Sequence, residues 1–199
     1  TPGVVSRNNT TLNNKTDDAG MKAYYALLSQ AEGVDSISQF NHPGTTFGNF
    51  SDFSYWDPVI DSRMYMVEVG NGEGQIGAGG YYPSYEQYIM ALDKGWHLAP
   101  TNNQDNHKGR WGNANDARDV ILTDNFTEKG IYEAIRALRM YATEDKNLEL
   151  GYTVNGQMMG SSITEVPEKL DLEVTVNDPD KSDSISKVEV VVNSGKVVH

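Results

Sequence analysis

The chain has 199 residues, a formal net charge of -12 and no cysteine. Its hydrophobic fraction of 38% and aromatic fraction of 10% are enough for a packed core, so we do not expect wholesale disorder. The acidic balance argues against a general nucleic-acid-coating surface, which needs Lys and Arg to displace counterions. The lack of cysteine removes disulfides, thiolate metal sites and cysteine nucleophiles. No apolar run approaches the roughly 18 residues of a membrane span.

Residues 17–145 alternate between predicted strands and predicted helices. The predicted strands cover residues 36–44, 63–72, 96–103, 119–125 and 140–145. The predicted helices cover residues 17–32, 83–95 and 126–139. Ser84 and Gln87 have the spacing of a capping box, Gly95 is placed as a C-terminal stop, and Thr127 is placed as an N-cap. This alternation predicts an α/β fold built from parallel βα units.

The pattern changes near Leu148, where short strands of period two begin, divided by Asn-Gly, Asp-Pro-Asp and Ser-Gly turns. With no helix pattern between them, these strands predict the start of a β-sandwich. We therefore expect two domains, residues 1–147 and 148–199. The acidic segment 177–183 resembles a calcium loop in composition but lacks the spacing of an EF-hand, and a solvated β-turn is the favoured interpretation. The chain starts at TPGVV without Met, so we expect an upstream segment.

The segment TNNQDNHKGRWGNANDAR, residues 101–118, carries candidate ligands among many Asn and Gly. It follows a predicted strand, and ligands of α/β proteins collect at the carboxyl ends of strands. Asp105 and His107 are two residues apart, so in an extended stretch both face the same side, and His42 closes the strand SISQFNH. Carboxylate and imidazole suit zinc, manganese or iron. The alternatives are a plain turn for the pair and a packed or exposed loop residue for His42.

Four segments together resemble a known family: QFNHPG, VEVGNG, ALDKGWHLAPTNNQDNHKGRWG and IYEAIRALRMYATEDKNLEL. They are similar to the C-terminal half of the polymerase-and-histidinol-phosphatase (PHP) metallophosphoesterases, in the CehA/McbA-like branch of secreted bacterial multidomain proteins. The resemblance covers roughly residues 30–150 and continues into the family's Ig-like domain through VNDPDKSDSISKVEVVVN. It implies a partial distorted (β/α)7 TIM-like barrel, followed by an Ig-like β-sandwich. It also implies His42, Asp105 and His107 as ligands of divalent ions (zinc, manganese or iron), two or three in the complete domain.

The early motifs of that family, a His-x-His pair and further His and acidic ligands, do not occur in this sequence, which contains four His in all. The three matching ligands fall short of a dinuclear site. The resemblance therefore implies that the missing N-terminal half of the PHP domain is a partner of this chain. We expect the chain by itself to be a poor catalyst.

Other side chains near these motifs have two interpretations each. Lys108 and Arg110 suit a substrate phosphate, Arg110 by its bidentate fork, and solvated loop cations are the alternative. Trp111 would stack on a substrate ring, although a packing anchor is favoured. His97 is expected to be a core histidine or one that supports a ligand. For Glu68, near the end of a strand, such a supporting role is the less favoured interpretation.

The resemblance implies metal-dependent hydrolysis of a phosphate ester, and we expect Asp105, His107 and Arg110 as the catalytic set and Lys108, Arg110 and Trp111 as substrate-binding residues. The substrate would be a phosphorylated small molecule or a nucleic acid. Two alternatives remain: a non-catalytic cell-surface binding module, and a hydrolase of a non-phosphate ester or amide. The resemblance implies a secreted or cell-surface bacterial protein, and a cytoplasmic location is the alternative.

Overall fold

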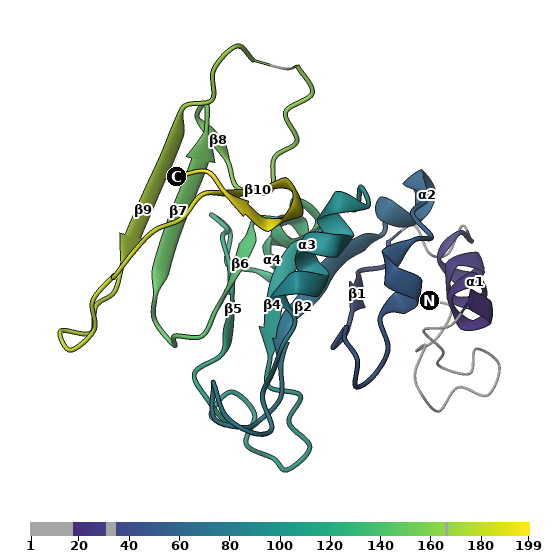
Figure 1. The fold of residues 1–199 in the computed structure, drawn as a ribbon, viewed down its shortest axis with the longest axis horizontal. Helices are drawn as coiled ribbons and strands as arrows, with labels where there is room; N and C mark the ends of the chain where they lie inside the picture. The colour runs from purple at the N-terminus through teal and green to yellow at the C-terminus, as the bar shows by residue number, and fades with distance from the viewer. Residues whose placement is uncertain (1–17, 31–34, 166) are drawn as a thin grey trace.

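The computed structural model describes residues 18–30, 35–165 and 167–199 of the chain (Figure 1). The fold is mixed α/β, as predicted, with several small sheets and few helices. The described residues form no closed barrel, so the partial barrel implied by the resemblance stays a prediction. Asp17 and residues 31–32, which were included in the first predicted helix, lie outside the described residues.

Three parallel strands form the centre of the fold and position the candidate site. β2 (Met64–Asn71) lies between β1 (Ser38–Phe40) and β4 (Ala99–Asn103) and is parallel to both. The short β3 (Tyr82–Pro83) pairs antiparallel with the end of β2 beyond β1. Because β1, β2 and β4 are parallel, their carboxyl ends meet at one edge of the sheet. There, the loops after β2 and β4 leave the sheet together at the lower end of Figure 1.

The next two strands differ from the predicted parallel units. β5 (Arg118–Ile121) pairs antiparallel with β6 (Met140–Thr143), and β6 lies beside β4 (Figure 1). The helix between them, α4 (Glu128–Arg136), ends at a tight reversal in which Leu138 adopts a φ of 54°. This reversal returns the chain directly along β5, so the expectation of parallel βα units throughout residues 17–145 was wrong for this pair.

Aromatic side chains form the core between the sheet and the N-terminal helices. The elements around it are α1 (Asp18–Leu28), the 3-10 helix η2 (Phe50–Phe53), α2 (Pro58–Asp61) and α3 (Tyr85–Asp93). Trp96, only 2% exposed, donates its indole N–H to the Phe53 carbonyl at 2.9 Å. Its ring meets that of Phe40 edge-on, with centroids 5.2 Å apart. Edge-to-face contacts of this kind add specificity to the burial that drives packing.

Helix ends follow the sequence signals in two of three cases. Thr127 caps α4, and its hydroxyl accepts the Gly130 N–H at 3.1 Å. Gly95 follows α3 with a φ of 97°, a conformation that favours glycine. Ser84 occupies the N-cap position of α3, but the predicted capping box is wrong. Its hydroxyl instead donates to the Glu68 carbonyl at 2.8 Å, which ties α3 to β2.

The C-terminal segment is all β. β7 (Glu149–Val154) pairs with β8 (Gln157–Met158) through a turn at Asn155 and Gly156, both with positive φ, and with β9 (Leu172–Asn177). β10 (Val191–Val192), the 3-10 helix η3 (Asn193–Gly195) and β11 (Lys196–Val197) follow.

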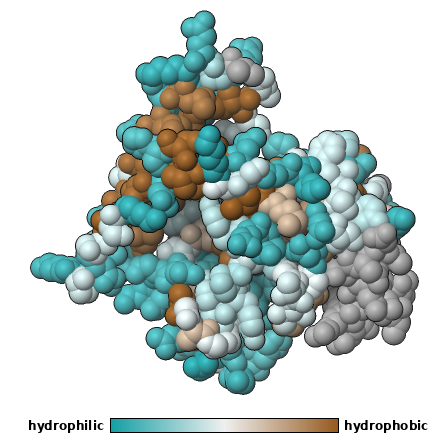
Figure 2. All heavy atoms as spheres, viewed as in Figure 1, coloured by the Kyte–Doolittle hydropathy of each residue, from teal (hydrophilic) through white to brown (hydrophobic). Residues whose placement is uncertain are grey.

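The strands of this segment carry exposed apolar side chains. Leu172 is 41% exposed and Val192 42% exposed, and hydrophobic residues gather over this part of the molecule in Figure 2. The sheets here are small and separate, so a β-sandwich domain at residues 148–199 stays a prediction. Within the part of the chain that the structure describes, none of the helices has both the length and the apolar character needed to cross a membrane.

Candidate functional site

A buried carboxylate lies at the edge where the parallel strands end. Glu68 of β2 is 3% exposed. Its carboxylate accepts the side-chain amide of Asn103 at 2.9 Å, the side-chain amide of Asn71 at 3.0 Å, and the backbone N–H of His42. These donors come from the ends of β4 and β2 and from the residues after β1. Glu68 of β2 therefore contacts both segments on which the predicted ligands lie, the one after β1 and the one after β4.

The surroundings of Glu68 disfavour its negative charge. Burial raises the pKa of this carboxyl from 4.5 to about 7, against the lowering effect of the hydrogen bonds from His42, Asn71 and Asn103, and the nearby charge of Asp105 raises it further. The donors are all uncharged, so they stabilise the carboxylate without neutralising it. A glutamate with these properties at a strand end is a candidate for metal binding or proton transfer. We expected at most a supporting role for Glu68.

The predicted ligands lie around this glutamate but not in one tight cluster. His107 Nε2 lies 3.0 Å from Asp105 Oδ1, and their side chains are 80% and 43% exposed. His42 packs its ring against Phe47, with centroids 4.6 Å apart, and reaches Glu68 through its backbone. Among the described residues, the ligand atoms of His42, Asp105 and His107 do not all lie within 4.8 Å of one another. Their convergence on one metal site stays a prediction.

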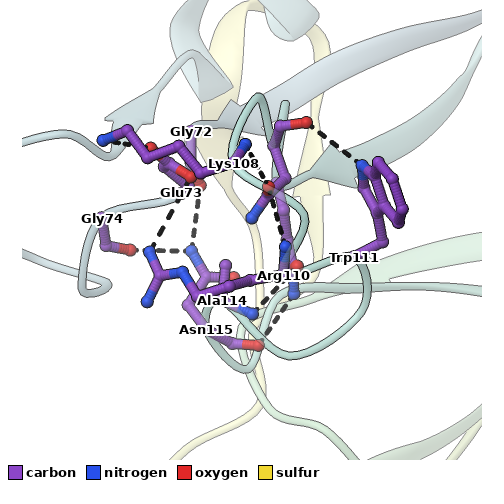
Figure 3. Close-up of polar contacts among 10 residues, drawn as sticks. Gly72, Glu73, Gly74, Lys108, Arg110, Trp111, Ala114 and Asn115 are labelled. Atoms are coloured by element: carbon purple, nitrogen blue, oxygen red, sulfur yellow. Dashed lines mark hydrogen bonds and ion pairs between the residues drawn. The ribbon is translucent and has the colours of Figure 1, made fainter.

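The two cations of the loop after β4 meet an acidic residue from the loop after β2 (Figure 3). Lys108 Nζ lies 2.9 Å from Glu73 Oε1, and Arg110 Nη2 lies 3.8 Å from Glu73 Oε2. The hydrogen bond from Lys108 is the largest of the influences that hold the pKa of Glu73 below its usual range. Glu73 thus pairs its carboxylate with both cations.

Asparagine and glutamine side chains hold these two loops together, which explains the unusual composition of residues 101–118. Asn115 donates to the carbonyls of Gly72 and Gly74 at 2.9 and 2.7 Å (Figure 3). Gln104 spans its own loop, donating to the Asn115 carbonyl at 2.8 Å and accepting the Ala114 N–H at 3.2 Å. The amides satisfy backbone groups that neither strand nor helix would pair. The turn interpretation of this segment is therefore correct for its scaffold.

Two other sequence interpretations are corrected. Trp111 is 80% exposed, and its indole N–H donates to the Asn106 carbonyl at 3.3 Å, so it is not a packing anchor. Its role in stacking on a substrate stays a prediction. His97 is neither a core residue nor near the ligands: its side chain is 59% exposed and its Nδ1 lies 2.8 Å from Asp61 Oδ2. Asp61 also accepts the His97 backbone N–H at 2.9 Å, so the pair fixes the entry to β4.

A separate acidic group lies near the C-terminal sheet. Asp145, after β6, has ligand atoms within 4.8 Å of those of Asp178 and Asp183, which both belong to the acidic segment 177–183. Asp145 also accepts the N–H groups of Asn147 and Leu148 at 2.8 and 3.0 Å. Sequence reasoning considered the acidic segment alone and missed Asp145, because nothing local signals that the two regions meet.

The comparisons add no family and no relative: no family model matches the sequence, and neither a curated protein nor a solved structure matches the chain.

Proposed function

We propose that the chain carries part of the site of a metal-dependent hydrolase of phosphate esters, of the PHP type that its motifs resemble. The observation that supports this most is the position of Glu68. Its buried carboxylate, surrounded by uncharged donors, lies between the segments that carry His42 and Asp105. A divalent cation would compensate the charge whose burial raises the pKa of Glu68 to about 7.

The donor set suits such an ion. Zinc, manganese and iron accept carboxylate oxygen and imidazole nitrogen as ligands. The carboxylates here are Glu68 and Asp105, and the imidazoles are His42 and His107. These four residues would hold the metal, with the remaining ligands contributed by the N-terminal half that the resemblance implies. A bound divalent ion would supply Lewis-acid polarisation of the ester and a lowered pKa for bound water.

The charged residues of the loops have a second role in this proposal. Lys108 and Arg110 would bind the phosphoryl oxygens in place of the Glu73 carboxylate, to which they are now paired. A phosphate ester would have to displace Glu73, whose side chain is 22% exposed, from the more exposed cations. Asn103, which bonds both Glu68 and the Thr101 hydroxyl, keeps the carboxylate in place.

Equilibrium dialysis of the chain against Mn²⁺ tests the metal site. We expect Asp105→Ala to weaken Mn²⁺ binding at least about ten-fold, while Asp116→Ala, at an exposed position of the same loop, leaves it within about two-fold. Because the acidic group at Asp183 would also attract Mn²⁺, each variant is repeated in an Asp183→Asn background. Equal Mn²⁺ binding by wild type and Asp105→Ala in that background would refute the proposal.

Hydrolysis of bis-p-nitrophenyl phosphate tests the reaction. The isolated chain should be slow, because the motifs that would complete the site do not occur in it. Where turnover is measurable, Arg110→Ala should lower kcat/KM by about 10- to 1000-fold, a loss of about 1.4–4 kcal/mol, with Mn²⁺ binding unchanged. Turnover of Arg110→Ala within about two-fold of wild type would instead support the interpretation of Arg110 as a solvated loop cation. A chain that hydrolyses a carboxylic ester or an amide but no phosphate ester would favour the alternative hydrolase.

A further inference from the structure

A groove of about 620 Å³ opens beside the His42 segment, and aromatic side chains form much of its wall. Phe47 comes from the loop after β1, Tyr82 from β3, and Tyr85 from the first turn of α3. These rings are 42%, 47% and 50% exposed, respectively. Exposure of large aromatic side chains to water is unfavourable, so three of them around one groove indicate a ligand that covers them.

Hydrogen bonds hold both walls of the groove, and those of one wall fix it to β2. On one side, Gly44 and Gly48 exchange backbone hydrogen bonds at 3.0 and 2.9 Å, which closes the tight loop that presents Phe47. On the other side, Ser84 bonds the Glu68 carbonyl through its hydroxyl at 2.8 Å and the Val69 carbonyl through its N–H at 2.8 Å. The groove is thus preformed, and a ligand in it would not have to order its walls.

The polar groups of the groove select against an anion. Its described lining contains neither Lys nor Arg, whereas Glu86 contributes a carboxylate and Thr45, Thr46 and Gln87 contribute hydroxyl and amide groups. Glu86 lies in the first turn of α3, where its charge already complements the helix dipole. Acceptors of this kind match a ligand rich in hydroxyl donors.

The ring geometry distinguishes a sugar from a nucleobase. The Phe47 and Tyr82 rings are 6.3 Å apart at an interplanar angle of 82°, so they present no pair of parallel walls between which a flat base would be sandwiched. A pyranose ring needs only one aromatic face for its C–H groups, with polar partners around its rim. The perpendicular rings and the surrounding acceptors meet that requirement.

We propose that this groove binds a neutral saccharide unit. The inference stands on the groove itself and does not depend on the proposed hydrolase. It also places a bound sugar next to His42, which lines the groove.

Titration of the metal-free chain tests this proposal by saturation-transfer NMR and calorimetry. The probes are neutral tetrasaccharides of glucose, mannose, xylose and N-acetylglucosamine, with adenosine as the nucleobase probe, each up to about 10 mM. We expect at least one tetrasaccharide to bind with a Kd on the order of 1 mM or tighter. Phe47→Ala and Tyr82→Ala should each weaken it about ten-fold or more. Tyr82→Phe should keep most of the affinity, because it preserves the ring.

Phe126→Ala is the matched control, since Phe126 is 91% exposed and lies outside the groove; it should change the Kd by less than about two-fold. Unchanged thermal midpoints in the groove variants would show that they fold. Binding of adenosine without any tetrasaccharide would overturn the proposal in favour of a base site. No binding by any probe, or saccharide binding that the groove variants leave unchanged, would also overturn it. None of these outcomes bears on Mn²⁺ binding, so the two proposals fail separately.

Discussion

Replacing Glu68 with glutamine should remove a large part of the pH dependence of stability. The pKa of Glu68 is about 7 in the folded chain and 4.5 without the protein environment. Below pH 4.5 the Glu68 carboxyl is protonated in the folded and the unfolded chain, so its ionisation does not lower the free energy of unfolding. As the pH rises from 4.5 to 7, the unfolded chain releases this proton while the folded chain keeps it, so stability falls. Above pH 7 the cost is constant.

The size of the effect follows from the same two pKa values. Each pH unit between them is worth about 1.4 kcal/mol, so ionised Glu68 costs the folded state about 3 kcal/mol. Glu68→Gln has no such titration. Its amide nitrogen would instead face the donors from His42 and Asn71, which adds a penalty of about 1 kcal/mol per lost hydrogen bond at every pH. The free energy of unfolding of the variant minus that of wild type should therefore increase by about 3 kcal/mol as the pH rises from 4 to 8.

Urea unfolding in EDTA, followed by the fluorescence of buried Trp96, measures this difference. Glu168→Gln, at an exposed position, is the matched control and should follow the wild-type profile within about 0.5 kcal/mol. A difference between wild type and Glu68→Gln that stays constant within about 1 kcal/mol from pH 4 to pH 8 would refute the argument, because Glu68 would then ionise as easily folded as unfolded.

The same measurement with Mn²⁺ links stability to the proposed site. Metal binding requires the carboxylate, so Mn²⁺ should offset the cost of ionised Glu68 above pH 7. At a concentration of about 100 Kd it should stabilise wild type by about 2.7 kcal/mol. In the Asp183→Asn background that isolates this site, Glu68→Gln should lose most of that gain.

Three smaller predictions concern the loops and the exposed strands. Gly72 has a φ of 118°, and a Cβ there would meet the Gly80 carbonyl, so Gly72→Ala should cost about 2 kcal/mol or more in urea unfolding, whereas Gly79→Ala, with open space around it, should cost less than about 1 kcal/mol. Glu73→Gln should raise the affinity of the loop cations for inorganic phosphate by up to about five-fold, measured by ³¹P NMR; unchanged affinity would show that they do not bind phosphate. Leu172→Lys with Val174→Lys should reduce binding of the dye ANS and change stability by less than about 1 kcal/mol, because both side chains are exposed; undiminished dye binding would place the accessible apolar surface elsewhere.

Local signals in the sequence predicted several helix ends and turns. The N-cap at Thr127, the stop at Gly95 and the Asn155-Gly156 turn all depend on residues within one turn of the backbone, and all are present. The direction of β5 against β6 could not be predicted in this way. Strand pairing is decided by contacts between distant residues, and alternation of strands and helices does not fix it.

The candidate site shows the same division between local and long-range information. Asp105 and His107 were found because they are two residues apart, and they do contact each other. Glu68 was undervalued, although a glutamate within the apolar run MVEVG is a signal, since burying a carboxylate is costly unless something compensates its charge. What the run did not reveal was the compensation by Asn71 and Asn103.

The arrangement of the loops also gives a reason why the site residues are so exposed. Asn115 and Gln104 satisfy backbone groups of the two loops. Asp105 and His107 contact each other, and the exposed cations pair with Glu73 of the neighbouring loop. Glu68, by contrast, is buried and pairs with the backbone of the segment that also lines the groove. In the two proposals, the residues that hold metal, anion and sugar overlap only at His42, which is a proposed metal ligand and also lines the groove. Substitutions at Asp105, Arg110 and Phe47 therefore test the three ligands separately.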